Sequence, residues 1–80
     1  MLHRLETNSK VVGMKQTIKA LQKNIATVVY VAEDADKRVV RQAIEIAKDQ
    51  GLPVITVETM VQLGKECKIE VKTAIAATIH

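Results

Sequence analysis

The residues best suited to bind an anion lie in one short stretch that runs from Gly13 to Lys19. Gly13 lets the backbone turn tightly, and the helix that it opens presents N–H groups to which phosphate oxygens bind well. Lys15 and Lys19 add positive charge, and the amide of Gln16 can donate and accept hydrogen bonds, as reading the edge of a base requires. A solvated helix start made of good helix formers explains the same residues about equally well.

Residues that could catalyse a reaction or bind a metal are few and far apart. Cys67 is the only cysteine, and His3 and His80 lie near opposite ends of the chain. We expect Cys67 to be a buried structural thiol, because it lies on the apolar side of its predicted helix. Asp34 and Asp36 precede another predicted helix, where acids are ordinarily capping groups. The sequence therefore predicts that the protein is not an enzyme and that it has no catalytic residues, no metal site and no cofactor.

Positive charge is concentrated towards the two ends of the chain. Residues 1–25 carry a net charge of +4 and residues 64–80 carry +1, whereas residues 26–63 carry −2. If folding brings the ends together, one face becomes an anion-binding surface. On charge alone, ordinary solvated lysines are the better explanation, because a total of +3 is common among soluble domains.

Length and composition predict one small domain with an aliphatic core. The chain has 80 residues, 48% of them hydrophobic, and Tyr30 is the only aromatic residue. We expect residues 1–80 to form a single domain. No apolar run is long enough for a membrane span or a signal peptide, and a lone cysteine fits a reducing compartment. These features predict a cytoplasmic protein with no membrane partner.

The elements that must position these residues alternate between strands and helices. A short helix over residues 2–9 and a very short strand over residues 10–12 are expected to precede the helix that opens at Gly13. The β-branched run over residues 26–32 is typical of a central strand. The next helix spans about residues 36–50, and its predicted apolar stripe consists of Val39, Val40, Ala43, Ile44 and Ala47.

A second strand (54–57), a helix (59–67) and a final strand (74–79) complete the pattern. The alternation predicts an α/β fold, a three-layer α/β/α sandwich with a small mixed four-stranded sheet. Residues 68–73 are expected to form a loop. Its Ile69 and Val71 are costly to expose unless a partner covers them, although packing into the core explains each one alone slightly better.

Four short motifs, in this order and spacing, resemble the kink-turn RNA-binding ribosomal-protein superfamily of the L7Ae/L30e type. They are Gly13-x-Lys15-Gln16-x-x-Lys19, Ala32-x-Asp34-Ala35-Asp36, Leu63-Gly64-Lys65 and Ile69-Glu70-Val71. Each motif is weak alone, but together they cover nearly the whole chain. The short length and the Lys15-Gln16 pair are most similar to the bacterial, ribosomal-protein-like YbxF-type members.

The resemblance implies a non-enzymatic protein that recognises and stabilises kink-turn RNA. Lys15, Gln16 and Lys19 would contact the tandem sheared G·A pairs and nearby phosphates, and the loop would pack against the kink. The RNA-binding residues expected from it are Gly13, Met14, Lys15, Gln16, Lys19, Ile69, Glu70, Val71 and Lys72. The implied partner is a structured RNA, ribosomal or regulatory, bound by a monomer. A protein-interaction adaptor with the same fold is the alternative.

Two features depart from the family pattern. Lys15-Gln16 stands where archaeal and eukaryotic members usually carry Asn-Glu. A carboxylate accepts a hydrogen bond from guanine more strongly than a neutral amide does, by up to about 1 kcal/mol per bond, so we expect lower affinity here. Lys68 and Lys72 flank the loop where small residues are common, and they would either strengthen phosphate contact or alter the shape of the loop.

Overall fold

The computed structural model describes residues 9–67 and 72–79, which form a mixed sheet covered by helices. Its strands are β1 (Lys10–Val12), β2 (Ala26–Ala32), β3 (Val54–Val57) and β4 (Ile75–Ile79). The central strand β2 pairs in parallel with β3 and antiparallel with β4, and β1 pairs antiparallel with the far side of β4. The strand order over the described residues is β1-β4-β2-β3, so the predicted mixed four-stranded sheet is confirmed.

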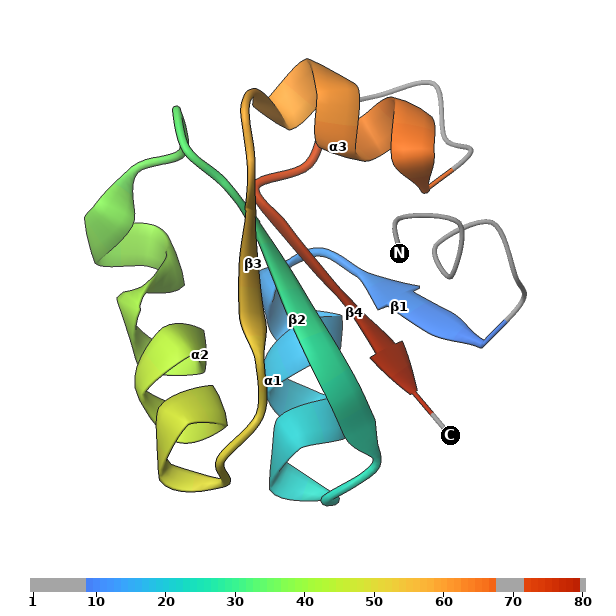
Figure 1. The fold of residues 1–80 in the computed structure, drawn as a ribbon, viewed down its shortest axis with the longest axis vertical. Helices are drawn as coiled ribbons and strands as arrows, with labels where there is room; N and C mark the ends of the chain where they lie inside the picture. Colours follow the sequence, from blue (N-terminus) through green and yellow to red (C-terminus); the bar gives the residue numbers. More distant parts are fainter. Residues whose placement is uncertain (1–8, 68–71, 80) are drawn as a thin grey trace.

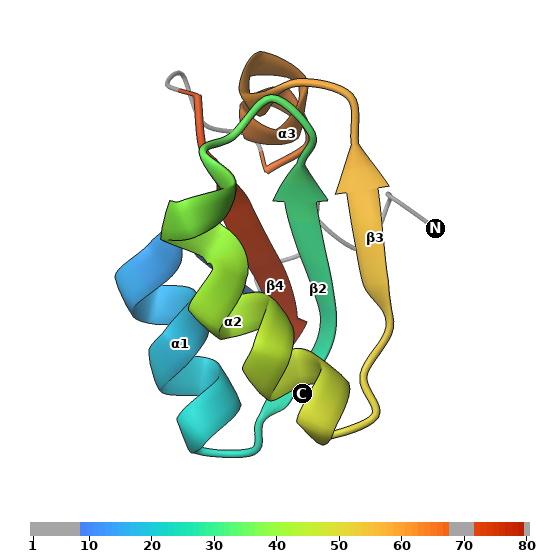
Figure 2. The same cartoon turned by 90° about the vertical axis from the view of Figure 1, so that its left-hand side faces the viewer.

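Helices lie on both faces of this sheet. They are α1 (Met14–Gln22), α2 (Lys37–Asp49) and α3 (Met60–Glu66). The two longer helices, α1 and α2, pack side by side over one face (Figures 1 and 2). The shorter α3 lies on the other side, across the end of the sheet where β2 and β3 finish (Figure 1). The predicted three layers are confirmed, and within the described residues α3 alone forms the second helical layer.

The core is aliphatic around one tyrosine. Tyr30 is fully buried in β2, and its neighbours in the sheet are Ile55 of β3 and Ala76 of β4. Leu21 of α1 and Leu63 of α3 are also fully buried, so helices from both layers reach the same core. Because Tyr30 is enclosed, it is not available as a platform on which bases could stack.

The apolar stripe predicted for α2 was only partly correct. Val39, placed on the buried stripe of α2, is 50% exposed. The residues of α2 that are buried are Val40, Ala43 and Ala47, and Val39 lies about 100° around the helix from Val40, outside this narrow stripe. On α1, Thr17 is fully buried, whereas Met14 and Ile18 are only partly buried.

The acids after β2 cap two different helices. Asp36 accepts a hydrogen bond from the backbone N–H of Arg38 at 2.9 Å and caps α2, as predicted. Asp34 also caps a helix, but the helix is α3, because its Oδ1 accepts the N–H of Met60 at 2.8 Å. The turn after β2 therefore fixes the start of both helices that follow it.

The predicted boundaries differ slightly from the structure at two places. The last strand begins at Ile75, and Ala74 lies in the bend before it. Of the helix expected over residues 2–9, only Ser9 is among the described residues, and Ser9 lies in a bend.

Candidate functional site

The start of α1 depends on an unusual backbone conformation at Gly13. Its φ of 92° and ψ of 162° lie in a region that is essentially restricted to glycine. The N–H of Gly13 donates a hydrogen bond to the carbonyl of Ile75 at 2.9 Å, and its carbonyl accepts the N–H of Thr17 at 3.0 Å. Gly13 thus redirects the chain from β1 into α1 and attaches this junction to the first residue of β4.

Within the described residues, no side chain caps the same helix start. Asp36 caps α2 and Thr59 caps α3, but at α1 the N-cap is Gly13, which has no side chain to donate or accept a hydrogen bond. The first N–H groups of an α-helix have no partners within the helix. Together with the helix dipole they form a local positive potential, which suits an anionic ligand such as a phosphate group.

The side chains around this start divide between the core and the surface. Lys15, Gln16 and Lys19 are exposed. Gln16 stands in the first turn of α1, and Lys19 lies one turn after Lys15. Met14, which the resemblance also places in the site, is partly buried. Its side chain packs against the core and thereby anchors the start of α1 to it.

The segment before β4 is tied to the same place. Thr73 donates its N–H to the carbonyl of Met60 at 3.1 Å and its hydroxyl to the carbonyl of Ile75 at 2.9 Å. The carbonyl of Ile75 therefore accepts hydrogen bonds from both Gly13 and Thr73. Lys72, the residue before Thr73, is exposed. The structure thus brings the end of the predicted loop next to the start of α1.

Three of the predicted site residues, Ile69, Glu70 and Val71, lie outside the described residues. The structure places Gly13, Met14, Lys15, Gln16, Lys19 and Lys72. Five of these six lie between Gly13 and Lys19, and Lys72 precedes Thr73, which donates a hydrogen bond to the same Ile75 carbonyl as Gly13 does.

Sequence reasoning missed two amides near the lysines of α1. Gln22 of α1 and Gln42 of α2 line a shallow groove together with Lys15, Ile18 and Lys19. Gln42 comes from a distant part of the chain, and only the packing of α1 against α2 brings it close. No spacing of residues within either helix signals this contact, because it depends on how α1 packs against α2.

The titratable groups of the described residues show no arrangement typical of catalysis. Burial raises the pKa of the Cys67 thiol, so it stays protonated and is a poor nucleophile. The hydrogen bond from the Arg38 side chain, helped by that from the Arg38 backbone, lowers the pKa of Asp36, which serves as a helix cap. Over residues 9–67 and 72–79, no three His, Cys, Asp or Glu side chains gather as metal ligands would. Nor do these residues include a helix with the length and apolar character needed to cross a membrane.

Comparison with known proteins gives consistent results. The model of the family described as "Ribosomal protein L7Ae/L30e/S12e/Gadd45 family" matches residues 2–80. An RNA-binding protein of Geobacillus sp. (strain WCH70) is 45% identical over 76 residues, which are 95% of this chain and 93% of that protein. RNA-binding protein YbxF of Geobacillus stearothermophilus is 43% identical with the same coverage.

A solved structure has a similar fold. The 15.5 kD RNA-binding protein of Giardia lamblia superposes with a TM-score of 0.88, covering 99% of this chain and 67% of that one. At 24% sequence identity, this similarity concerns the fold alone.

Proposed function

The chain belongs to the ribosomal protein L7Ae/L30e/S12e/Gadd45 family, and from this premise we propose that it binds structured RNA and recognises the kink turn. Two relatives with 43–45% identity over 95% of the chain carry the name RNA-binding protein. The observation that carries the proposal is the hydrogen bond between Gly13 and Ile75, which joins the start of α1 to the first residue of β4, the strand that follows the loop. This bond supports the proposal that both halves of the surface lie in one copy of the chain and that a monomer binds the RNA.

In this proposal the helix start binds the RNA backbone. Phosphate oxygens would accept hydrogen bonds from the first N–H groups of α1, and the ammonium groups of Lys15 and Lys19 would add charge. These contacts position the RNA without reading its sequence. Among residues 9–67 and 72–79 no side chain caps α1, which supports this role, because a cap would compete with the ligand for the same N–H groups.

Gln16 supplies the base-specific part. Its exposed amide stands in the first turn, close to where the phosphates would lie, and it can donate to and accept from the edges of a sheared G·A pair. Ile69, Glu70, Val71 and Lys72 would complete the surface, with the two aliphatic side chains packed against the unstacked bases of the kink.

The protein would stabilise the kink by binding the bent RNA better than the extended one. A duplex that contains a kink turn, with dyes on its two arms, reports bending by energy transfer. We expect the protein to bend this duplex and to bind it more tightly than a duplex whose G·A pairs are replaced by Watson–Crick pairs. Equal affinity for the two duplexes would contradict recognition of the kink turn.

Substitution of Gln16 separates base recognition from charge. Gln16→Ala should weaken binding to the intact kink turn but leave the weak binding to the Watson–Crick duplex unchanged. Lys48→Ala is the matched control, because Lys48 is exposed on α2 and lines a different groove.

A further inference from the structure

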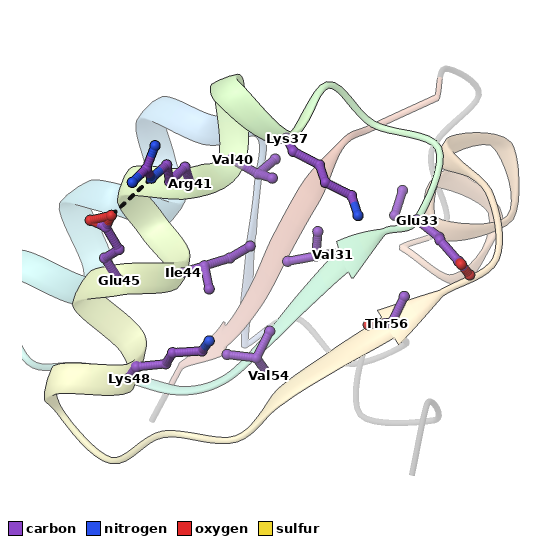
Figure 3. A pocket seen from close by; sticks show the side chains of 11 residues that line it. Val31, Glu33, Lys37, Val40, Arg41, Ile44, Glu45, Lys48, Val54 and Thr56 are labelled. Carbon is purple, nitrogen blue, oxygen red and sulfur yellow. Dashed lines mark hydrogen bonds and ion pairs between the residues drawn. The ribbon is translucent and has the colours of Figure 1, made fainter.

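A second groove lies on the other side of α2 from α1, between α2 and the edge strand β3 (Figure 3). Its volume is about 740 Å³, and its floor is apolar. The floor consists of Val31 of β2, Val40 and Ile44 of α2, and Val54 of β3. This groove exists because α2 lies over the middle of the sheet beside α1 and leaves the outer part of β3 uncovered.

Two lysines extend over this floor. Figure 3 shows Lys37 reaching from the start of α2 towards the end of β2, and Lys48 reaching from the other end of α2 towards Val54. Within the described part of the chain, neither lysine forms an ion pair.

The other charges of the groove do not neutralise these lysines. Arg41 and Glu45 pair with each other, with Nε and Oε1 3.1 Å apart. The carboxylate of Glu33 points away from Lys37 (Figure 3). An apolar floor with an unpaired cation at each end fits a ligand that is apolar in its middle and acidic on both sides.

The backbone of β3 adds a second condition. On its inner side, β3 accepts hydrogen bonds from β2, from Val29 N–H to the carbonyl of Pro53 at 3.0 Å and from Glu33 N–H to the carbonyl of Val57 at 2.7 Å. Because hydrogen bonding alternates along a strand, the N–H and C=O groups of Val54 and Thr56 are directed away from β2. No described strand lies on that outer side.

The open backbone edge and the groove meet at the same two residues, because Val54 and Thr56 also line the groove. We propose that this site binds an extended acidic segment of a partner protein, which adds a strand to β3 and inserts alternate side chains into the groove. A helix in the same place would leave the outward backbone groups of Val54 and Thr56 without partners, so the structure favours a strand.

The spacing of the lysines defines the segment. Lys37 and Lys48 are eleven residues apart in sequence, or roughly 16 Å along a helix that rises about 1.5 Å per residue. In a strand, side chains at i, i+2 and i+4 point to one face, and the outer two are about 13 Å apart. The flexible lysine stems cover the difference. The segment would therefore read acid-x-apolar-x-acid, with the apolar side chain on the floor between the lysines.

This site is distinct from the proposed RNA surface and does not rest on it. The strand order places β3 and β1 at opposite edges of the sheet, and α1 starts directly after β1. RNA and an acidic segment would therefore bind at the same time, each without weakening the other.

Fluorescence polarisation with a labelled peptide, Ser-Thr-Asp-Thr-Val-Thr-Glu-Thr-Ser, tests the proposal. We expect saturable binding that falls about tenfold or more when both acids are replaced by lysine, and also when the valine is replaced by serine. The first change tests charge, and the second tests the apolar floor. No saturable binding below about 1 mM peptide would overturn the proposal.

Exchange of charge gives a sharper test on the protein. The double variant Lys37→Glu, Lys48→Glu should no longer bind the acidic peptide. It should instead bind the peptide that carries lysine in place of the two acids. The matched control, Lys23→Glu, changes an exposed lysine outside the groove and should leave both affinities unchanged. If the double variant still bound the acidic peptide more tightly, the peptide would bind at another site and the proposal would be wrong.

Thr56→Pro tests the strand pairing. Proline is tolerated on an outward-facing edge position but removes the N–H that the added strand needs. Peptide binding should be lost in Thr56→Pro and retained in Thr56→Val, while a thermal melt shows that both variants fold. Unchanged binding in Thr56→Pro would refute the added strand. A self-association of the chain that Thr56→Pro abolishes would show that a second copy occupies this edge, which would also overturn the proposal.

Discussion

The backbone N–H of Gly13 donates a hydrogen bond of 2.9 Å to the carbonyl of Ile75. This bond connects the start of α1 with the start of β4, which follows the predicted loop. Thr73 donates its hydroxyl to the same carbonyl at 2.9 Å. Two segments that are distant in the sequence are thereby fixed to one oxygen atom. The surface proposed for RNA depends on this junction, so changes at Gly13 test it most directly.

We expect Gly13→Ala to lower both stability and RNA affinity. A Cβ at Gly13 would meet no atom within 4 Å, so crowding is not the cause. The cost comes from the backbone, because an alanine is strained at a φ of 92° and a ψ of 162°, by about 1–3 kcal/mol. Relief of the strain would move the α1 start away from Ile75. Urea denaturation measures the free energy of unfolding, and a gel shift with a kink-turn duplex measures affinity.

Gly51→Ala is the control for this prediction. Gly51 follows α2 with a φ of 70° and also has open space around the position of a Cβ. Its replacement should cost about 1 kcal/mol of stability, since glycine is favoured in this conformation after a helix. RNA affinity should not change. If both variants lost affinity equally, the loss would reflect general destabilisation rather than the junction at Gly13.

Lys19→Ala should reduce the salt dependence of RNA binding. Each phosphate that a lysine neutralises contributes about 0.7–0.9 to the slope of log affinity against log salt concentration. The loss of one contact should lower the slope by that amount and weaken binding to kinked and unkinked RNA alike. The slope is measured by titration at several salt concentrations. Lys48→Ala removes the same charge from the groove beside β3 and should leave the slope unchanged.

The sheet and its helices could be predicted from local patterns in the sequence. The run of β-branched residues over Ala26–Ala32 forms the buried central strand, and Asp36 caps α2 as its position predicted. Such features depend on residues close together in the chain. The role of Asp34 could not be predicted in this way, because it caps α3, whose first residue, Met60, is far along the chain.

The candidate site could be predicted only in part. The helix that opens at Gly13 was predicted, and Lys15, Gln16 and Lys19 are exposed on it. The hydrogen bond from Gly13 to Ile75 follows from how β1 pairs with β4, which no local pattern encodes. The groove beside β3 was also missed. It results from the lateral position of α2 over the sheet, and no spacing of residues within α2 fixes that position.

Cys67 should make stability depend on pH in the alkaline range. Burial raises the pKa of its thiol above the ordinary value of 9.0, with Lys10 opposing this shift and Glu66 adding to it. The folded state therefore keeps the proton when the unfolded chain has lost it. The resulting contribution to stability is complete below pH 9.0 and is lost as the pH rises towards the folded value.

The measurement is urea denaturation between about pH 7 and pH 10, a range that spans the ordinary thiol pKa. The free energy of unfolding should fall more steeply above pH 9 in the original protein than in Cys67→Ala. The comparison uses the slope of the free energy of unfolding against pH. The stability that Cys67→Ala loses through its smaller side chain is the same at every pH and does not affect this slope. Identical slopes would show that Cys67 ionises as readily in the folded protein as in the unfolded chain.

The buried hydroxyl of Thr17 offers a place where the protein should be made more stable. Thr17 is fully buried in α1, and its Oγ1 has no hydrogen-bond partner among the described residues. A buried polar group without a partner costs about 1–3 kcal/mol, and valine has the same shape without the hydroxyl. Thr17→Val should therefore raise the free energy of unfolding by about 1 kcal/mol or more.

Thr78→Val provides the opposite case, because Thr78 Oγ1 lies 2.7 Å from Thr27 Oγ1, and its removal should lower stability by about 1 kcal/mol. Urea denaturation of both variants measures the free energy of unfolding. A loss of stability in Thr17→Val would mean that the hydroxyl of Thr17 has a hydrogen-bond partner in solution.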